Sequence, residues 1–220
     1  MTVKILFLRW SAGITSTLLV LALGGCVIVH HDQKGKGLSA ASANNGEFDS
    51  KGYVDTNWDA KIIPELTQNA ADLPTVLAAL KADPDAARVK YGRRQEESAP
   101  FTFIVRGQLK VKAANLESGA ATLELATPAP TDDGAVLVQI GPVIKTSAVR
   151  DALSFVHFGD FTNQVDFANL SRALNTRVKE TVVGTLDRPS LVGKTVKFTG
   201  AFAEDPGVVL ITPVLLEVVK

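Results

Sequence analysis

Apolar and polar residues alternate between positions 101 and 112, a period of two that predicts a half-buried β-strand. The positions expected to face inward are Phe101, Phe103, Val105, Leu109 and Val111. Gly107 falls on the same face in mid-strand, where a residue without a side chain predicts a bulge or a sharp bend. Further strands bounded by Gly, Pro, Asp or Ser are predicted over residues 121–128, 135–144, 194–202 and 208–219.

Apolar residues spaced three and four apart predict helices elsewhere. Leu73, Val76, Leu77 and Leu80 form one apolar stripe, and Asp72 is placed to cap the start of that helix. The Asp-Pro pair at 83–84 ends this helix and begins a shorter one that reaches residue 91. Two more helices are expected, over 148–153 and over 163–183, the second with a buried face made by Phe167, Leu170, Leu174 and Val178.

The order of elements is therefore three strands, a helical insertion and two more strands. This order predicts a mainly β protein with helices (α+β), built as a five-stranded OB-like barrel with a helix between its third and fourth strands. An α+β sheet with a helix packed on one face is the alternative. The domain boundaries that follow are a signal peptide at 1–25, an anchor and flexible spacer at 26–48, a helical segment at 49–99 and the barrel at 100–220.

The amino terminus has the layout of a secretory signal. Lys4 and Arg9 precede an apolar run at 14–23, and small residues lead to Cys26. The ending LGGC resembles the lipobox of bacterial lipoproteins, which implies cleavage before Cys26, acylation of its sulfur, and attachment to the inner or outer membrane through lipid. The alternative is an uncleaved helix, because residues 10–29 carry no charge and a helix of ~20 residues spans a bilayer. Both interpretations export residues 30–220.

Composition narrows the partners of the exported body. The 220 residues hold 23 basic and 23 acidic side chains, and removal of residues 1–25 leaves 21 basic against 23 acidic. A slightly acidic body argues against nucleic acid as a partner. Cys26 is the single cysteine, so neither a disulfide framework nor a cysteine-based metal site is predicted. We expect no metal and no cofactor.

Catalytic signatures are missing from the sequence. It contains no GxSxG elbow, no HExxH helix and no glycine-rich phosphate loop. His157 lies among aromatic residues, and a partly buried structural histidine is the favoured interpretation over a general base. Asp151, Asp160 and Asp166 are close in sequence, but helix electrostatics explains them as well as acid–base chemistry does. The sequence therefore favours a protein that is not an enzyme.

Polar residues gather around the longer predicted helix and its approach. Amide and guanidinium groups form paired planar hydrogen bonds, the chemistry that sugar hydroxyls require, and Phe155, Phe158 and Phe161 could supply aromatic faces. The alternative is a solvated helix surface with caps. The candidate ligand-binding residues are Arg150, Asp151, Asn163, Gln164, Asn169, Arg172 and Asn175.

Longer stretches of the body resemble a known family. They read WDAKIIPEL, ADLPTVLAALKADPDAARVKYGRR, VLVQIGPVIKTSAVRDALSFVHFGDFTNQVDFANLSRALNTRVK and LVGKTVKFTGAF. In these stretches the chain is similar to the bacterial predicted periplasmic lipoproteins described as domain of unknown function 2291. The spacer after Cys26 departs from the family pattern, because it is longer and more flexible in composition than expected. The resemblance implies an accessory role beside an ABC-type sugar uptake system. A carbohydrate, the transporter and its binding protein are therefore candidate partners, and the alternative is an interaction or scaffold lipoprotein of the cell envelope without a small-molecule ligand.

Overall fold

The computed structural model describes residues 48–127 and 134–219. The chain divides into two units, residues 1–33 and residues 34–220, and every described residue belongs to the second. The predicted signal peptide, the acylation of Cys26 and almost all of the spacer lie outside the described residues.

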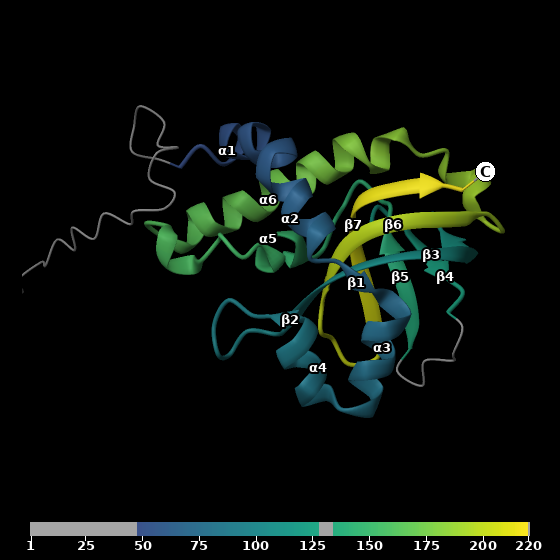
Figure 1. Cartoon of the computed structure of the whole chain (residues 1–220). Coiled ribbons are helices and arrows are strands. Elements are labelled where there is room, and N and C mark those ends of the chain that lie inside the picture. Colours follow the sequence, from purple (N-terminus) through teal and green to yellow (C-terminus); the bar gives the residue numbers. More distant parts are fainter. Residues whose placement is uncertain (1–47, 128–133, 220) are drawn as a thin grey trace, which may run out of the picture. The chain divides into compact units, whose positions relative to one another are not determined.

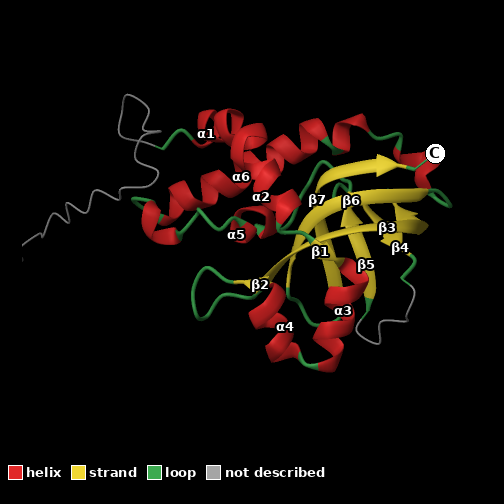
Figure 2. Ribbon diagram, viewed as in Figure 1, coloured by secondary structure: helices red, strands yellow, loops and turns green. Residues whose placement is uncertain are grey.

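The strands that follow residue 100 form a closed barrel in the described part of the chain (Figures 1 and 2). The strand order is β3-β4-β5-β7-β6, and β6 pairs again with β3 to close the ring. β5 and β7 run parallel, while the other neighbouring pairs in this ring run antiparallel. This topology confirms the predicted OB-like barrel. The strand bounds are β3 Thr102–Asn115, β4 Thr122–Leu125, β5 Ala135–Gln139, β6 Thr195–Ala203 and β7 Val208–Val218.

Gly107 provides space in the barrel and does not mark a bulge. The β3–β6 ladder runs past Gly107 without a shift in register, and Gly107 lies opposite Phe198. A Cβ atom at position 107 would lie 3.0 Å from the Cζ atom of the Phe198 ring. The irregularity in β3 falls instead between Val111 and Ala113, where β3 pairs with β4. The prediction of a bulge at Gly107 was therefore wrong, while the alternative of a sharp bend there stays a prediction.

The segment before the barrel is helical, as predicted, with two short strands that pair with β3. Asp72 caps α3 by accepting from the Thr75 amide at 3.4 Å, and Asp83 caps α4 by accepting from the Ala86 amide at 3.0 Å. A π-helical turn over residues 58–62 joins α1 to α2. The bounds are α1 Ser50–Asn57, α2 Ile63–Gln68, β1 Ala71–Asp72, α3 Leu73–Ala82, α4 Pro84–Tyr91 and β2 Gly92–Arg93.

Two helices occupy the connection between β5 and β6, which confirms the predicted insertion. They are α5, Ala148–Ala152, and α6, Gln164–Thr181. Asn163 caps α6 by accepting from the Asp166 amide at 2.9 Å. The α6 residues Leu170, Leu174 and Val178 are buried, while Phe167 is half-buried at the end of the same face.

Two apolar cores hold the body together. The first fills the barrel, where Phe103 and Phe202 stack at 5.1 Å and where Leu73 of α3 enters from outside the ring. The second lies between the helices and the outer face of the barrel, where Ala201 of β6 and Val214 of β7 meet the apolar faces of α1, α2, α5 and α6. Figure 2 shows these four helices grouped on one side of the barrel and α3 and α4 beside another part of it.

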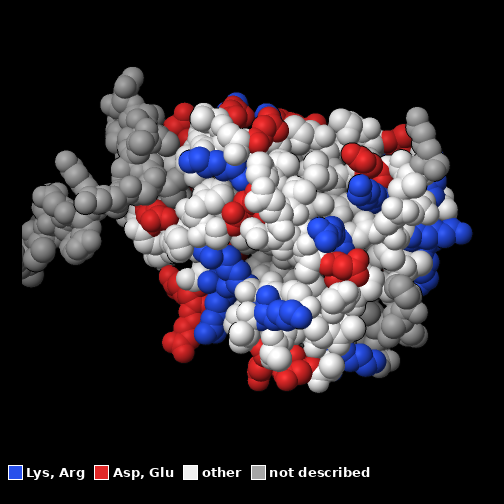
Figure 3. All heavy atoms as spheres, in the orientation of Figure 1, with Lys and Arg blue, Asp and Glu red and all other residues white. Residues whose placement is uncertain are grey.

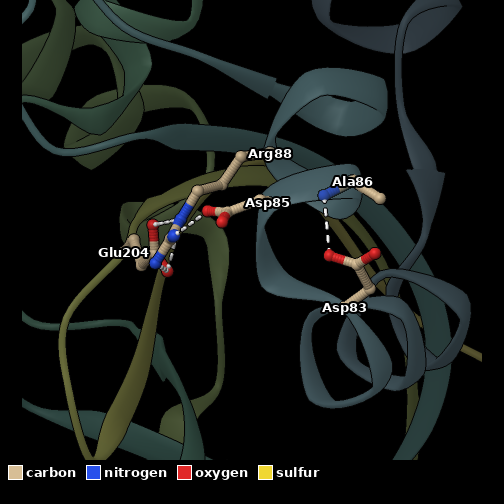
Figure 4. Close-up of polar contacts among 5 residues, drawn as sticks. All are labelled: Asp83, Asp85, Ala86, Arg88 and Glu204. Atoms are coloured by element: carbon tan, nitrogen blue, oxygen red, sulfur yellow. Dashed lines mark hydrogen bonds and ion pairs between the residues drawn. The ribbon is translucent and has the colours of Figure 1, made fainter.

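An ion pair fastens α4 to the end of β6 (Figure 4). The Arg88 Nε and Nη2 atoms donate to the two carboxylate oxygens of Glu204 at 2.9 and 2.7 Å, and Nη1 donates to Asp85 at 2.7 Å. The hydrogen bond that Arg88 donates to Glu204, followed by the one that it donates to Asp85, raises the pKa of Arg88 above its ordinary value. The guanidinium group therefore stays charged and joins two elements that are far apart in sequence.

Among residues 48–127 and 134–219, no helix has the length and apolar character needed to cross a bilayer.

Candidate ligand-binding site

A hollow of about 510 Å³ lies between the 94–100 loop and the helices α5 and α6. This volume is typical of small-molecule sites, which measure roughly 300–1,000 Å³. Two phenylalanine rings and several polar side chains share its wall. The lining residues are Gln95, Glu96, Ala99, Pro100, Ser147, Arg150, Asp151, Phe158, Gln164 and Phe167. We call this hollow the α5–α6 pocket.

Arg150 and Asp151 form an ion pair in the wall of the α5–α6 pocket. The Arg150 Nη2 and Nε atoms lie 2.7 and 2.8 Å from Oδ1 of Asp151. The hydroxyl of Ser147, four residues earlier, donates to Oδ2 of Asp151 at 2.6 Å. The side chains of the pair are 12% and 19% exposed, so each keeps some surface in the pocket.

An aromatic ring fixes Arg150 from a second direction. Its guanidinium carbon lies 3.6 Å from the centre of the Phe167 ring, the distance of a cation–π contact. Its Nη1 atom donates to the Phe167 carbonyl at 3.2 Å. Phe158 meets the Phe167 ring edge to face at 5.3 Å. The charged group is therefore held over the aromatic part of the pocket.

Gln95 attaches the 94–100 loop to the region after α5. Its Nε2 atom donates to the carbonyl of Val156 at 3.0 Å and to the carbonyl of Asp151 at 3.4 Å. Its Oε1 atom is buried and has no hydrogen-bond partner within the described part of the chain. An unmet buried acceptor carries a desolvation cost of about 1–3 kcal/mol. Gln95 therefore attaches the loop to α5, and its Oε1 atom is an unsatisfied acceptor on a residue that lines the pocket.

The structure brings only some of the predicted ligand-binding residues together. Arg150, Asp151 and Gln164 line the α5–α6 pocket. Asn163 is used as the cap of α6, and Asn175 donates to the Thr146 carbonyl at 2.8 Å. Those two amides therefore have structural roles that the described contacts explain.

Asn169 and Arg172 line a different hollow, of about 250 Å³, between α6 and α1. Arg172 donates to Asn169 at 2.5 Å, and both belong to a solvated helix face. Across the hollow, Lys51 pairs with Asp55 at 2.6 Å, and this hydrogen bond lowers the pKa of Asp55 below its usual value. The polar groups here largely satisfy one another.

His157 is exposed, which corrects the expectation of a partly buried residue. Its side chain is 59% exposed, with Nδ1 3.4 Å from Asp160 and Nε2 3.3 Å from Arg93. Asp160 also acts on Tyr53. Burial, followed by the negative charge of Asp160, raises the pKa of the Tyr53 phenol above its usual 10.0. Of the three carboxylates singled out in the sequence, Asp151 lines the α5–α6 pocket, whereas Asp160 accepts from the His157 amide and Asp166 contacts Asn163.

The sequence did not indicate the wall of the α5–α6 pocket that the 94–100 loop forms. Gln95, Glu96, Ala99 and Pro100 come from a connection with no hydrophobic period, and Ser147 lies just before α5. A weak signal was available in Pro100, which separates the polar run at 93–98 from the alternating strand.

Comparison with known protein families shows to which family this chain belongs. Residues 16–217 match the model of a family described as predicted periplasmic lipoprotein (DUF2291). The chain belongs to this family. Membership makes it an exported lipoprotein of the cell envelope, anchored by lipid on the periplasmic side.

Structural comparison of this lipoprotein supports the fold. An OB-fold protein from Thermotoga maritima, known from a crystal structure, is similar with a TM-score of 0.64 and 22% sequence identity. The match covers 78% of the lipoprotein and 99% of the other chain. At this identity the likeness shows the fold alone. No curated protein matches the lipoprotein sequence.

One face of the lipoprotein carries mixed charge. On the face drawn in Figure 3, Lys and Arg side chains lie among Asp and Glu side chains and do not form one basic stripe. Within residues 48–127 and 134–219, no cluster of three or more His, Cys, Asp or Glu side chains is arranged to hold a metal ion.

Proposed function

We propose that this lipoprotein binds a carbohydrate in the α5–α6 pocket and serves as a non-enzymatic accessory protein of an ABC-type sugar uptake system. The observation that carries the proposal is the pocket itself, which places an ordered guanidinium–carboxylate pair and an amide beside two phenylalanine rings.

Hydrogen-bonding capacity in the pocket suits hydroxyl groups, which both donate and accept. Arg150 has five N–H donors, and within the described residues it contacts only Asp151 and the Phe167 carbonyl through them, so donors remain for a ligand. Gln164 is exposed at the first turn of α6, and its side-chain amide makes no hydrogen bond within the described residues. An amide offers a donor and an acceptor to neighbouring hydroxyls.

Aromatic side chains add the apolar part of a sugar site. Phe158 and Phe167 are half-buried, line the same pocket and contact each other. Small-molecule sites combine such apolar surface with a few fixed polar groups. The rigid contacts of Arg150 mean that little side-chain freedom is lost on binding, which favours affinity.

The transport role rests on family resemblance and on location. The lipid anchor is on the periplasmic side, and attachment to the inner membrane would hold the protein beside an uptake system. At that position the lipoprotein could deliver or retain a sugar for the transporter or for its soluble binding protein, without chemical change to the sugar.

Thermal unfolding and titration calorimetry of a soluble form covering residues 34–220 test the proposal. A sugar at about 100 times its Kd adds roughly 2.7 kcal/mol of stability, which raises the unfolding midpoint by several degrees in a domain of this size. Gln164→Ala should weaken binding by about 2–10-fold, the effect of one lost hydrogen bond. Arg172→Ala is the matched control, because Arg172 lies in the other hollow.

Two results would contradict the proposal. One is the absence of any shift across a broad panel of monosaccharides and short oligosaccharides. The other is equal loss of binding in Gln164→Ala and Arg172→Ala, which would move the site away from the α5–α6 pocket. The first result would favour the interaction protein without a small-molecule ligand.

A further inference from the structure

We infer that the α5–α6 pocket selects uncharged sugars and rejects sugar acids and sugar phosphates, because the cation in its wall already carries its own counter-ion. This inference rests on the proposed function and names the ligand class of the same site.

The charges in the pocket wall do not favour an anion. The ionisable side chains among its lining residues are Glu96, Arg150 and Asp151, one cation against two carboxylates. A site that captures a carboxylate or phosphate normally presents an unpaired Arg or Lys to it. Here the only such group in the lining is paired within the protein at 2.7 Å.

The internal pair cannot easily be exchanged for a ligand anion. Oδ1 of Asp151 accepts a hydrogen bond from Nε of Arg150 and lies at ion-pair distance from its Nη2, and Oδ2 accepts from the Ser147 hydroxyl, so both carboxylate oxygens are held. Arg150 is held in turn by the ring and carbonyl of Phe167. A ligand carboxylate would therefore have to displace Asp151 from an ordered site, or approach it closely at the cost of like-charge repulsion.

Glu96 adds negative charge on the opposite wall. It is exposed and makes no ion pair within the described part of the chain. The neighbouring cations of the same loop are used elsewhere. Arg93 donates to the Ser154 carbonyl and contacts His157, while Arg94 donates to the Glu97 carbonyl and lies over Phe101 at 4.9 Å. Neither residue is part of the pocket lining.

The test compares sugars that differ only in charge. Calorimetry at low salt on residues 34–220 would use glucose with glucuronate and glucose 6-phosphate, galactose with galacturonate, and mannose with mannuronate. We expect at least one neutral sugar to bind and its acid to bind at least about tenfold more weakly, the cost of an uncompensated like charge.

Substitutions in the wall make the test specific to these residues. Asp151→Asn leaves Arg150 without its counter-ion and should raise the affinity for the sugar acid by at least about tenfold. Glu96→Gln, at an exposed position that the fold does not need, should raise the affinity for the sugar acid by a smaller factor. This gain should disappear in high salt. Glu97→Gln is the matched control, because Glu97 belongs to the same loop but not to the pocket lining.

The outcomes separate the inference from the proposed function. If the sugar acids bind as tightly as the neutral sugars, or if neither Asp151→Asn nor Glu96→Gln changes the affinity for an acid, the inference is wrong and the carbohydrate site stands. If no member of any set binds, the inference fails, and the broad sugar panel described above decides whether the proposed function fails with it.

Discussion

The barrel interior is filled by side chains that solvent does not reach, whereas the wall of the α5–α6 pocket is built from side chains that keep part of their surface in water. Phe103 and Phe202 stack inside the barrel, while Arg150 and Asp151 are ordered through hydrogen bonds and an aromatic ring outside it. The barrel-interior residues stabilise the fold through burial, and the residues of the pocket wall present polar and charged groups to a ligand. Stability and recognition therefore reside in different residues, and substitutions should separate them.

The largest effect is expected from Phe103→Ala. Phe103 is fully buried, and removal of a buried aromatic ring costs about 3–5 kcal/mol of unfolding free energy. Urea unfolding followed by circular dichroism would measure the loss, and the affinity of the remaining folded protein for its ligand should be unchanged. Val89→Ala, at a residue 87% exposed, should change stability by less than about 0.5 kcal/mol. Equal losses in the two variants would contradict the barrel core.

Gly107→Ala should have a smaller effect on the same interior. The added methyl group would lie 3.0 Å from the Phe198 ring, and overpacking of this kind costs about 1–3 kcal/mol. Chemical unfolding would measure it. Gly159→Ala is the control, since a Cβ at position 159 meets nothing within 4 Å. A Gly107→Ala protein as stable as the parent would show that the Phe198 ring can move aside.

Glu204→Gln tests a contact that belongs to neither region. The change removes the charge that Arg88 binds from β6 and should lower the thermal midpoint by no more than about 2–4 °C, because the pair is partly exposed. The effect should shrink in high salt. Glu217→Gln, at an exposed position on β7 with no ion pair within the described residues, should leave the midpoint unchanged. A Glu204→Gln effect as large as that of Phe103→Ala would make α4 part of the core.

Tyr53 should give the smallest effect, visible only in alkali. Its pKa is higher in the folded protein than in the unfolded chain, so the neutral phenol stabilises the fold. That stabilisation is complete below about pH 10 and is lost as the pH rises through the higher folded pKa. Unfolding free energy measured from pH 8 to 11 should therefore fall more steeply for the parent than for Tyr53→Phe. Parallel curves would show that Tyr53 does not titrate differently on folding.

The sequence was sufficient for the barrel because its strands alternate and its helices begin at recognisable caps. Phe103 and Val105 were expected inside and lie inside, and Asp72 caps α3 as expected. Gly107 shows the limit of such reasoning. A mid-strand glycine predicts some departure from a regular strand. Only the structure shows that the Phe198 ring, opposite Gly107 in the ladder, packs against the backbone there.

The candidate site was harder to predict, for two physical reasons. One wall comes from residues 94–100, where no period of two or of 3.6 marks the positions that face inward. The candidates on α6 are also spread along its axis. Gln164 and Asn175 are eleven residues apart, which at 1.5 Å per residue is about 16 Å, so one small ligand cannot reach both. Proximity in sequence therefore grouped residues that the helix separates.

The ladder between β3 and β6 sets the order in which the chain can finish folding. It joins residues 102–110 to residues 195–203, and β7 pairs with both β5 and β6. A chain that emerges from its amino terminus onward must keep β3 open along one edge until more than 80 further residues have followed. Contacts of such long range slow folding, and an open edge invites pairing with other chains. The time between the emergence of β3 and of β7 is therefore the interval in which this protein is most exposed to aggregation.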